Sequence, residues 1–475
     1  MTYVFYDTET TGTDPDFDQI LQFAAIRTDD ELNVVDTLNV NCRLLPYVAP
    51  SPGALLVHGI PATEIMARPL SHYAMMRQIE RRLSEWSVGG AVFVGWNSMP
   101  FDEKFLRQAF YKTLQPIYKT VTQGNGRADG MALARAAAES MPGSLSLPAV
   151  DGKAVFKLGA IAEANGIVLD HAHDALADTE ATLAIARLVK AKSPSLWTEM
   201  LANARKIEVE RRLSDAAPML LSETYFGTTY HRIVAPVGPS RKSPNSWIVF
   251  DLQFDPRELA AIASEALEIT LRGALKPTRT VRTNAQPTLL PVDYAPAKIR
   301  GGRLPLEVYR DRATALAELG GFRSRLVDLV DGLQREKPGS AFVEQRIYER
   351  FPSTKEQRTL TAFRRADWVE RAALIDKFDD DRHREIALRL VGADSPQSLD
   401  AGKRRQWELW RRDRLNPSVE VPWLTLPKAI AEAKELRAKE PASKQPLIDA
   451  ASAVLAEIAE GREAAEAQET GIPRT

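Results

Sequence analysis

The chain has very little cysteine and almost no net charge. Its 475 residues include a single cysteine, Cys42, and the formal net charge is −1 with a pI near 6.7. One cysteine excludes an internal disulfide framework and a thiolate zinc site, and it suits a reducing cytoplasm. A nearly neutral chain carries no overall signature of nucleic-acid binding, so any such surface has to be local.

Long apolar runs are also absent. No stretch of about eighteen apolar residues occurs, and no basic region followed by an apolar signal-type segment precedes the first predicted strand. The sequence has no His-Glu-x-x-His run, which excludes that type of zinc site. We therefore expect a cytoplasmic protein that does not span a membrane.

The first of three short acidic clusters is Asp7-Thr8-Glu9. It ends the apolar run 3–6, which predicts a buried strand, and Thr10-Thr11-Gly12 then predicts a turn. Alternation along a strand places Asp7 and Glu9 on one side and Thr8 on the other. Two carboxylates on one face repel each other unless a cation lies between them, and a hard divalent ion is the usual partner.

The second cluster contains Asp102. The apolar run 91–95 predicts a strand, and a helix is expected to begin near Asp102. This residue could bring a third carboxylate to the same site. Alternatively, it only caps the helix, because aspartate is a preferred residue at helix starts.

The third cluster contains His173 and Asp178. An alanine-rich stretch predicts a helix that begins near Asp170 or Asp174. A spacing of five carries His173 off the Asp178 face, onto the loop or first turn that leads into the helix. Taken alone, such a histidine is more often a surface or core residue than a catalytic one.

Together the clusters predict a metal-dependent hydrolytic site. Four carboxylates from three elements can hold two Mg²⁺ or Mn²⁺ ions about 3.5–4 Å apart, which suits in-line displacement at a phosphodiester. One ion lowers the pKa of the attacking water and the other stabilises the leaving oxygen. His173, with an ordinary pKa of about 6.5, is the candidate general base.

These residues, in this order and spacing, resemble the DEDDh group of 3′→5′ exonucleases, and more narrowly the bacterial exodeoxyribonuclease I family. The stretches that carry the resemblance are Asp7-Thr8-Glu9-Thr10, Gln22 to Asp29, Val57-His58-Gly59-Ile60, Val94-Gly95-Trp96-Asn97 with Phe101-Asp102, Glu163 to Ile167, and Ala172 to Asp178. A patchier likeness continues through Ser246 to Leu252 into the carboxyl-terminal end.

The resemblance implies a role for each matched residue. Asp7, Glu9, Asp102 and Asp178 would be metal ligands, with His173 as the general base. Thr10 would lie near the terminal nucleotide, and Lys157 would face nucleic acid, although a lysine at an element end is often only solvated. His58 is interpreted as structural, holding its turn by a hydrogen bond.

Composition divides the chain into three parts. Residues 1–193 alternate predicted strands and helices, which indicates an α/β sheet. Residues 194–341 begin with a predicted helix near 196–212 and continue as short strands typical of a small barrel. Residues 342–475 are predicted to form successive helices. Helices are predicted at 342–351, 355–364, 368–377, 382–390 and 402–415, and a helical tail runs from 447 to near Gly471. The resemblance implies a ribonuclease-H-like exonuclease domain, an SH3-like β-barrel and a helical carboxyl-terminal domain.

Two kinds of segment suggest nucleic-acid contacts. The stretch 270–305 is basic, with Asp293 as its only acid, and is read either as a phosphate-facing surface or as a solvated loop. Its basic residues are Arg272, Lys276, Arg279, Arg282, Lys298, Arg300 and Arg303. Tyr225, Phe226 and Tyr230 are candidates for base stacking, whereas Trp407 and Trp410 are expected to pack inside the helical region.

The function that follows from the resemblance is processive 3′→5′ degradation of single-stranded DNA to 5′-mononucleotides, in DNA repair and recombination. Two alternatives are an RNA-directed DEDDh exonuclease and a catalytically weak nucleic-acid-binding scaffold. The resemblance further implies two Mg²⁺ ions with Mn²⁺ as a substitute, single-stranded DNA-binding protein as a partner, and a monomer.

Overall fold

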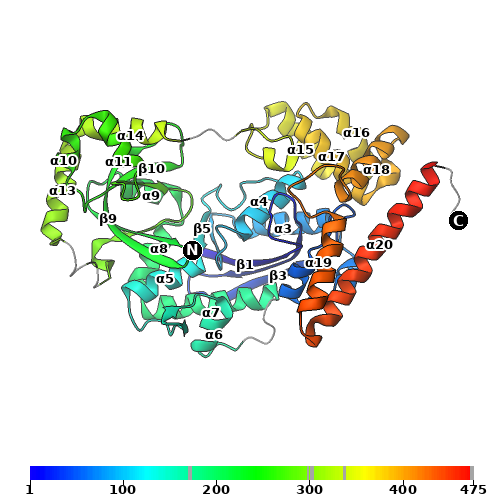
Figure 1. Ribbon diagram of the computed structural model, residues 1–475, viewed down its shortest axis with the longest axis horizontal. Coiled ribbons are helices and arrows are strands. Elements are labelled where there is room, and N and C mark those ends of the chain that lie inside the picture. The colour runs from blue at the N-terminus through cyan, green and yellow to red at the C-terminus, as the bar shows by residue number, and fades with distance from the viewer. Residues whose placement is uncertain (169–173, 297–298, 300–303, 335–337, 471–475) are drawn as a thin grey trace.

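The computed structural model describes residues 1–168, 174–296, 299, 304–334 and 338–470, the last ten of these by their backbone alone. A five-stranded sheet occupies the middle of the molecule, a second sheet lies on one side of it, and helices lie on the other (Figure 1). The first sheet has the order β3-β2-β1-β4-β5. Its strands are β1 (Thr2–Thr10), β2 (Ile20–Thr28), β3 (Val34–Asn41), β4 (Ala91–Gly95) and β5 (Gly126–Asp129).

This first sheet is mixed, and its inner strands β1, β2 and β4 are buried on both faces, whereas the edge strand β3 is largely exposed. Strands β1, β2 and β3 are antiparallel, whereas β4 runs parallel to β1 and to β5. Val4 and Tyr6 pack with α3 (His72–Trp86) and α4 (Asp102–Lys112), while Tyr3 and Phe5 face the opposite side. That side is covered by α5 (Gly130–Ser140), α6 (Leu158–Ala164) and α7 (Ala175–Lys192). Two buried faces explain why the first strand reads as a continuous apolar run.

Two predictions for the next part of the chain need correction. The single helix expected near 196–212 is two helices, α8 (Pro194–Ala202) and α9 (Lys206–Leu213), because Asn203 and Ala204 close α8 with tight turns to Met200 and Leu201. The second sheet has the order β11-β10-β9-β8-β12, and no pairing between β11 and β12 closes it within the described residues. The small barrel is therefore not confirmed.

The second sheet is antiparallel and carries its own helices. Its strands are β8 (Met219–Tyr225), β9 (Thr228–Pro239), β10 (Ser246–Asp251), β11 (Thr278–Arg282) and β12 (Thr288–Pro291). The helices are α10 (Pro256–Ala261), α11 (Ser264–Arg272), α13 (Leu306–Glu318) and α14 (Gly320–Gly332). One apolar core joins this region to the first sheet, since Leu220 and Ile248 belong to the same buried cluster as Tyr3 and Val92.

The carboxyl-terminal region is helical, as predicted, except at its start. Residues 342–351 form only a 3₁₀ turn over Val343–Arg346, followed by a turn, a bend and irregular backbone instead of an α-helix. The helices are α15 (Thr354–Arg365), α16 (Trp368–Leu374), α17 (Asp381–Asp394), α18 (Ala401–Leu415), α19 (Leu426–Lys439) and α20 (Gln445–Thr470). The predicted end of order near Gly471 lies outside the described residues.

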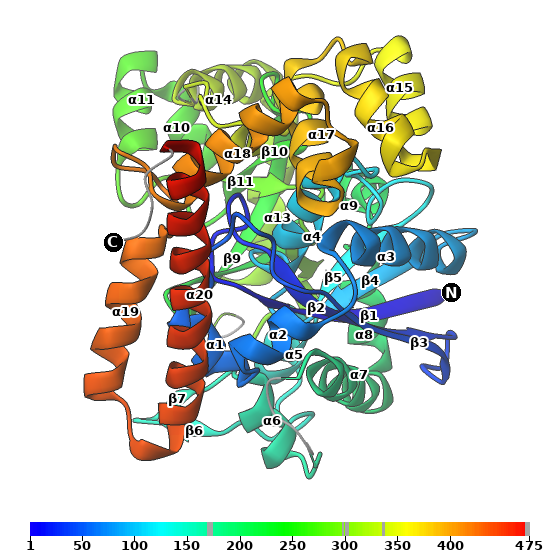
Figure 2. The same ribbon diagram turned by 90° about the vertical axis from the view of Figure 1, so that its right-hand side faces the viewer.

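Two features of this region bear on the earlier predictions. Trp407 is buried and stacks on Trp410, and both rings contact Tyr47, which confirms that the tryptophans pack. Helices α19 and α20 lie side by side and return to the first domain, where they contact α1 (Pro52–His58) and α2 (Ala62–Ala67) (Figure 2). Among the described helices, none combines the length and apolarity needed to cross a membrane.

Candidate active site

Strand β1 carries the first two predicted carboxylates at its carboxyl end. Parallel pairing with β4 stops at Phe5 opposite Val94, so Asp7 and Glu9 extend past the paired part of that neighbour. On its other side Glu9 stays paired with Gln22 of β2. Both acidic side chains are only partly buried, and they lie on the same face of the strand, as the alternation predicts.

Helix α7 brings the third carboxylate. Asp174 caps the helix by accepting hydrogen bonds from the Leu176 and Ala177 amides, and Asp178 therefore falls in the first turn. Ligand atoms of Asp7, Glu9 and Asp178 lie within 4.8 Å of one another. Residues up to 171 positions apart in the sequence thus meet at one point, with the spacing that a metal ion needs.

Asp102 lies beside this group, at the first residue of α4. It is not the N-cap of that helix, because Phe101 occupies that position. Its carboxylate is buried and accepts a 2.6 Å hydrogen bond from the Thr8 hydroxyl. The Thr8 side chain points away from Asp7 and Glu9, as predicted. From that face of the strand its hydroxyl reaches and holds the Asp102 carboxylate.

Burial and mutual repulsion raise the pKa values of these carboxyls. Burial raises the pKa of Asp7 well above its ordinary value, and the charges of Asp102, Glu9 and Asp178 raise it further. Burial, then Asp178 and Asp102, raise the pKa of Glu9 to about 8. Burial also raises the pKa of Asp102 to about 7, although the Thr8 hydrogen bond opposes this shift.

The residues present fit a divalent cation. No lysine or arginine in the described ranges forms an ion pair with Asp7, Glu9 or Asp102, so their repulsion is not relieved by a side chain. Oxygen-only ligands of this kind suit hard ions such as Mg²⁺ or Mn²⁺. His173 lies outside the described residues.

Two carboxylates have supporting roles that were not predicted from the sequence. Asp129 caps α5 and also accepts the amides of Asn97 and Met99, so it holds the loop that leads from β4 to Asp102. Asp174 accepts a 2.9 Å hydrogen bond from Gln22, and its charge raises the pKa of Glu9. An aspartate just before an alanine-rich helix is a capping signal, which marked Asp174 as a possible helix start and could have identified Asp129 as well.

The remaining predicted residues have simple surroundings. Thr10 is buried and its hydroxyl donates a 2.7 Å hydrogen bond to the Gly12 carbonyl. Lys157 is exposed at the residue preceding α6. His58 accepts a 3.1 Å hydrogen bond from the Ile60 amide, which confirms its interpretation as a turn-holding residue.

The candidate nucleic-acid surfaces are described in part. Arg272 pairs with Glu268 and Arg279 lies 3.5 Å from Glu223, whereas Lys298, Arg300 and Arg303 lie outside the described residues. Tyr225, Phe226 and Tyr230 are exposed around the β8–β9 turn. Their part in base stacking stays a prediction.

Two family models match the chain. The first, described as "Exonuclease", matches residues 4–186, and the second, "Exonuclease I C-terminal domain", matches residues 342–458. The first match spans the mixed sheet and all three clustered carboxylates, which confirms the ribonuclease-H-like exonuclease fold. The second confirms a helical carboxyl-terminal region.

Known proteins of the same kind are similar over most of the chain. Exodeoxyribonuclease I of Escherichia coli K12 is 28% identical over 432 residues, covering 88% of this chain and 90% of that protein. The enzyme of Haemophilus influenzae is 26% identical over 435 residues, covering 88% and 91%.

Three solved structures named Exonuclease I, of which the dA16 complex and the zinc-bound complex are of the Escherichia coli enzyme, are similar across 96% of this chain and 99% of theirs. The complex with a dA16 oligonucleotide has a TM-score of 0.82 at 26% identity. A zinc-bound complex with single-stranded DNA has a TM-score of 0.81 at 25% identity. A structure described as SSB/Exonuclease I with the inhibitor CFAM has a TM-score of 0.80 at 26% identity.

Proposed function

The chain belongs to the bacterial exodeoxyribonuclease I family, and from this premise we propose that it hydrolyses single-stranded DNA stepwise from the 3′ end and releases 5′-mononucleotides. The observation that carries the proposal is the meeting of Asp7, Glu9 and Asp178 within 4.8 Å. Intact carboxylates at each matched position also argue against a catalytically weak scaffold.

Asp7, Glu9, Asp102 and Asp178 are proposed to hold two divalent ions, Mg²⁺ with Mn²⁺ as a substitute. The raised pKa values support this assignment, because a cation would relieve the repulsion that produces part of the shift. When bound, such ions supply the Lewis acidity that phosphodiester hydrolysis requires.

His173 is proposed as the general base that accepts a proton from the attacking water. Its place in the sequence, one residue before the Asp174 cap and five before Asp178, supports this role. Thr8 would act as a positioning residue through its hydrogen bond to Asp102. Thr10 and Lys157 are proposed to contact the terminal nucleotide and the DNA backbone.

The other regions are proposed to hold the strand and the partner. We propose an exonuclease domain over 1–193, an SH3-like domain over 194–341 and a helical domain over 342–475, arranged so that DNA stays bound between cuts. The zinc-bound structure of the Escherichia coli enzyme supports divalent-metal use, and the SSB/Exonuclease I structure supports a single-stranded DNA-binding protein as partner. A cytoplasmic monomer acting in DNA repair completes the proposal.

The decisive experiment compares 5′-labelled single-stranded DNA and RNA of matched sequence, with and without Mg²⁺. The wild type is expected to give a 3′-shortening ladder on DNA, and Asp178→Ala to give none. Glu180→Ala is the matched control, since Glu180 is exposed on the same helix two residues further on and should leave the ladder intact.

Each alternative has its own outcome. Cleavage of RNA with little cleavage of DNA would replace the DNA assignment with the RNA-directed one. A silent wild type that still binds DNA tightly would favour the scaffold. Processivity is checked by adding excess unlabelled DNA as a trap after the first encounter, and arrest after one or two cuts would contradict it.

A further inference from the structure

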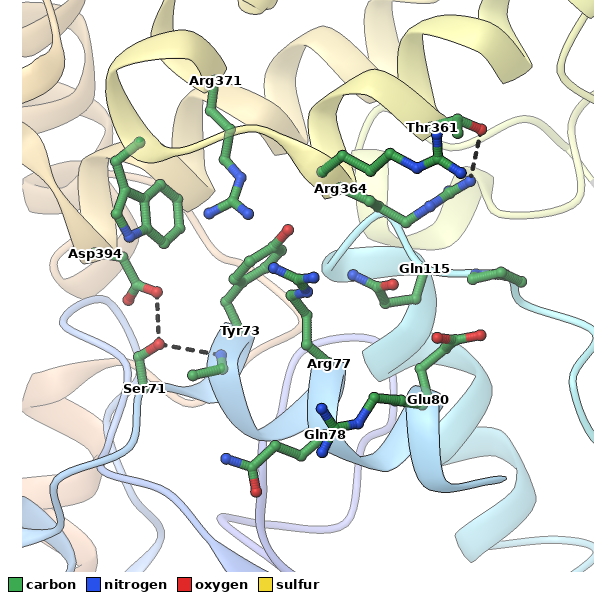
Figure 3. Close-up of a pocket in the computed structure, with 15 residues that line it drawn as sticks. Ser71, Tyr73, Arg77, Gln78, Glu80, Gln115, Thr361, Arg364, Arg371 and Asp394 are labelled. Atoms are coloured by element: carbon green, nitrogen blue, oxygen red, sulfur yellow. Dashed lines mark hydrogen bonds between the residues drawn. The ribbon is translucent and has the colours of Figure 1, made fainter. Parts of the chain in front are cut away.

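A cavity of about 680 Å³ lies between α3 and the carboxyl-terminal helices α15 and α16 (Figure 3). The other face of α3 packs on the first sheet through Met75, Met76 and Ile79. The cavity therefore lies across α3 from the sheet, and its lining includes no carboxylate of the candidate active site. We call it the arginine cavity because of the residues that line it.

Five arginines reach the arginine cavity from three helices. They are Arg77 and Arg81 on α3, Arg364 and Arg365 on α15, and Arg371 on α16. Of these five arginines, only Arg81 forms an ion pair with a described residue, a 3.8 Å contact with the exposed Glu85. The other four arginines line the cavity without an ion-pair partner among the described residues, with Arg77 and Arg365 exposed at its rim.

The two carboxylates that line the cavity already have partners other than the five arginines. Glu80 forms a 3.0 Å ion pair with Lys119. Asp394 accepts a 2.5 Å hydrogen bond from Ser71 and lies 3.9 Å from Arg43. The lining consequently carries an excess of positive charge.

Two of the arginines are held in place and partly desolvated. Arg371 is buried, donates a 3.0 Å hydrogen bond through Nε to the Phe363 carbonyl, and lies over the Trp368 and Tyr73 rings at 4.4 and 4.6 Å. Arg364 donates to the Leu114 carbonyl. Burial lowers the pKa of both guanidinium groups. Desolvated cations of this kind are unfavourable until an anion approaches them.

Tyr73 supplies an independent observation. Its side chain is 3% exposed, and its hydroxyl has no hydrogen-bond partner among the described residues. Figure 3 shows this ring extending from α3 toward Arg371 on the opposite wall. A buried hydroxyl is nearly always hydrogen-bonded, so the site lacks an acceptor at this point.

We propose that the arginine cavity is a second phosphate-binding site, separate from the catalytic carboxylates. A phosphate presents several acceptor oxygens and up to two charges on one group, so converging guanidinium groups and a phenol can bind it together. The cavity volume lies in the range of small-molecule sites and accommodates a nucleotide. The phosphate belongs either to a free 5′-mononucleotide or to the backbone of a DNA strand.

The test uses the full chain carrying Asp178→Asn, in EDTA, so that neither cleavage nor metal binding contributes. Calorimetric titration with inorganic phosphate, thymidine 5′-monophosphate and oligo(dT) is compared at matched chloride. The double substitution Arg77→Gln, Arg365→Gln is expected to weaken binding at least about fivefold, since each charged hydrogen bond contributes substantially. Arg405→Gln is the matched control, because Arg405 is exposed on α18, lines no part of this cavity and should leave affinity unchanged.

Tyr73→Phe separates a ligand contact from a structural role. Removing an unpaired buried hydroxyl should leave the melting temperature unchanged or raise it. The proposal expects the same variant to weaken phosphate binding severalfold. Affinity that is unchanged in both Tyr73→Phe and the arginine double variant would overturn the proposal.

The probes distinguish the two sources of phosphate. Binding of the mononucleotide alone assigns a free nucleotide, and stronger binding of oligo(dT) with a steep salt dependence assigns the strand. No binding of any phosphate probe, or binding of an acidic peptide in their place, would refute the site. A failure of the proposed exonuclease activity would instead appear as a missing ladder with phosphate binding intact.

Discussion

At Glu9, burial and three neighbouring carboxylates act in the same direction on one side chain. The pKa of Glu9 is raised from 4.5 to about 8 by burial first, and then by Asp178, Asp102 and Asp174. Because the folded pKa exceeds the unfolded one, the stabilisation from protonated Glu9 is complete below pH 4.5. It is lost as the pH rises through about 8.

We therefore predict that Glu9→Gln stabilises the metal-free chain at high pH. In EDTA, the free energy of unfolding of the variant minus that of wild type should be about 1–3 kcal/mol more favourable at pH 9 than at pH 5. Urea unfolding at both pH values measures this difference in the free energy of unfolding. Added Mg²⁺ should reduce the difference at pH 9, because the ion binds ionised Glu9 in the wild type. Identical pH dependence in the two proteins would contradict the assignment.

Thr8 offers a second test at this scale. Its hydroxyl lowers the pKa of Asp102 against the larger effect of burial, so Thr8→Val should raise that pKa further above about 7. Metal affinity is expected to fall about 10–100-fold, as for other groups that orient ligands. The Mg²⁺ dependence of the cleavage rate measures this loss, and Thr8→Ser, which keeps the hydroxyl, should recover most of it.

At the scale of the element, α4 is held by Glu103, the residue after Asp102. The buried Glu103 carboxylate accepts hydrogen bonds from Arg107 at 2.7 Å, Arg127 at 2.8 Å and Thr120 at 2.6 Å. Glu103→Gln should lower the free energy of unfolding by about 2–4 kcal/mol, because it leaves buried guanidinium groups without their counter-charge. Glu85→Gln, on the exposed side of α3, is the control in the same denaturant titration.

Elements with a clear periodic pattern could be predicted from the sequence, whereas a helix that is interrupted or replaced by a turn could not. Strand β1 and the helix after Asp174 follow from an apolar run and a capping aspartate. The break at Asn203 carries no glycine or proline, so the division of α8 from α9 had no local signal. Residues 342–351 form a short 3₁₀ turn in place of the predicted α-helix, and Val343 and Ile347 are nevertheless buried in a shared core.

At the scale of the whole molecule, the apolar cores cross the proposed domain boundaries. One joins Tyr3 to Leu220 of the second sheet, and another joins Tyr73 to Phe363 and Trp407 of the helical region. We predict a single cooperative transition in scanning calorimetry. Trp407→Ala should shift that whole transition downward, by an amount equivalent to about 3–5 kcal/mol. Two resolved transitions, with only one moved by the substitution, would show that the regions unfold separately.

The sequence by itself determined the carboxylates, their strands and helices, and the family, because these depend on residue type, local periodicity and spacing. Only the tertiary structure decided that Asp102 is held by Thr8, that Asp129 holds the loop before it, and that arginines of α3 and α15 line one cavity. The last of these groupings brings together residues as far as 288 positions apart in the sequence, Arg77 and Arg365. No local pattern encodes them, since they arise only when the apolar faces of separate elements pack together.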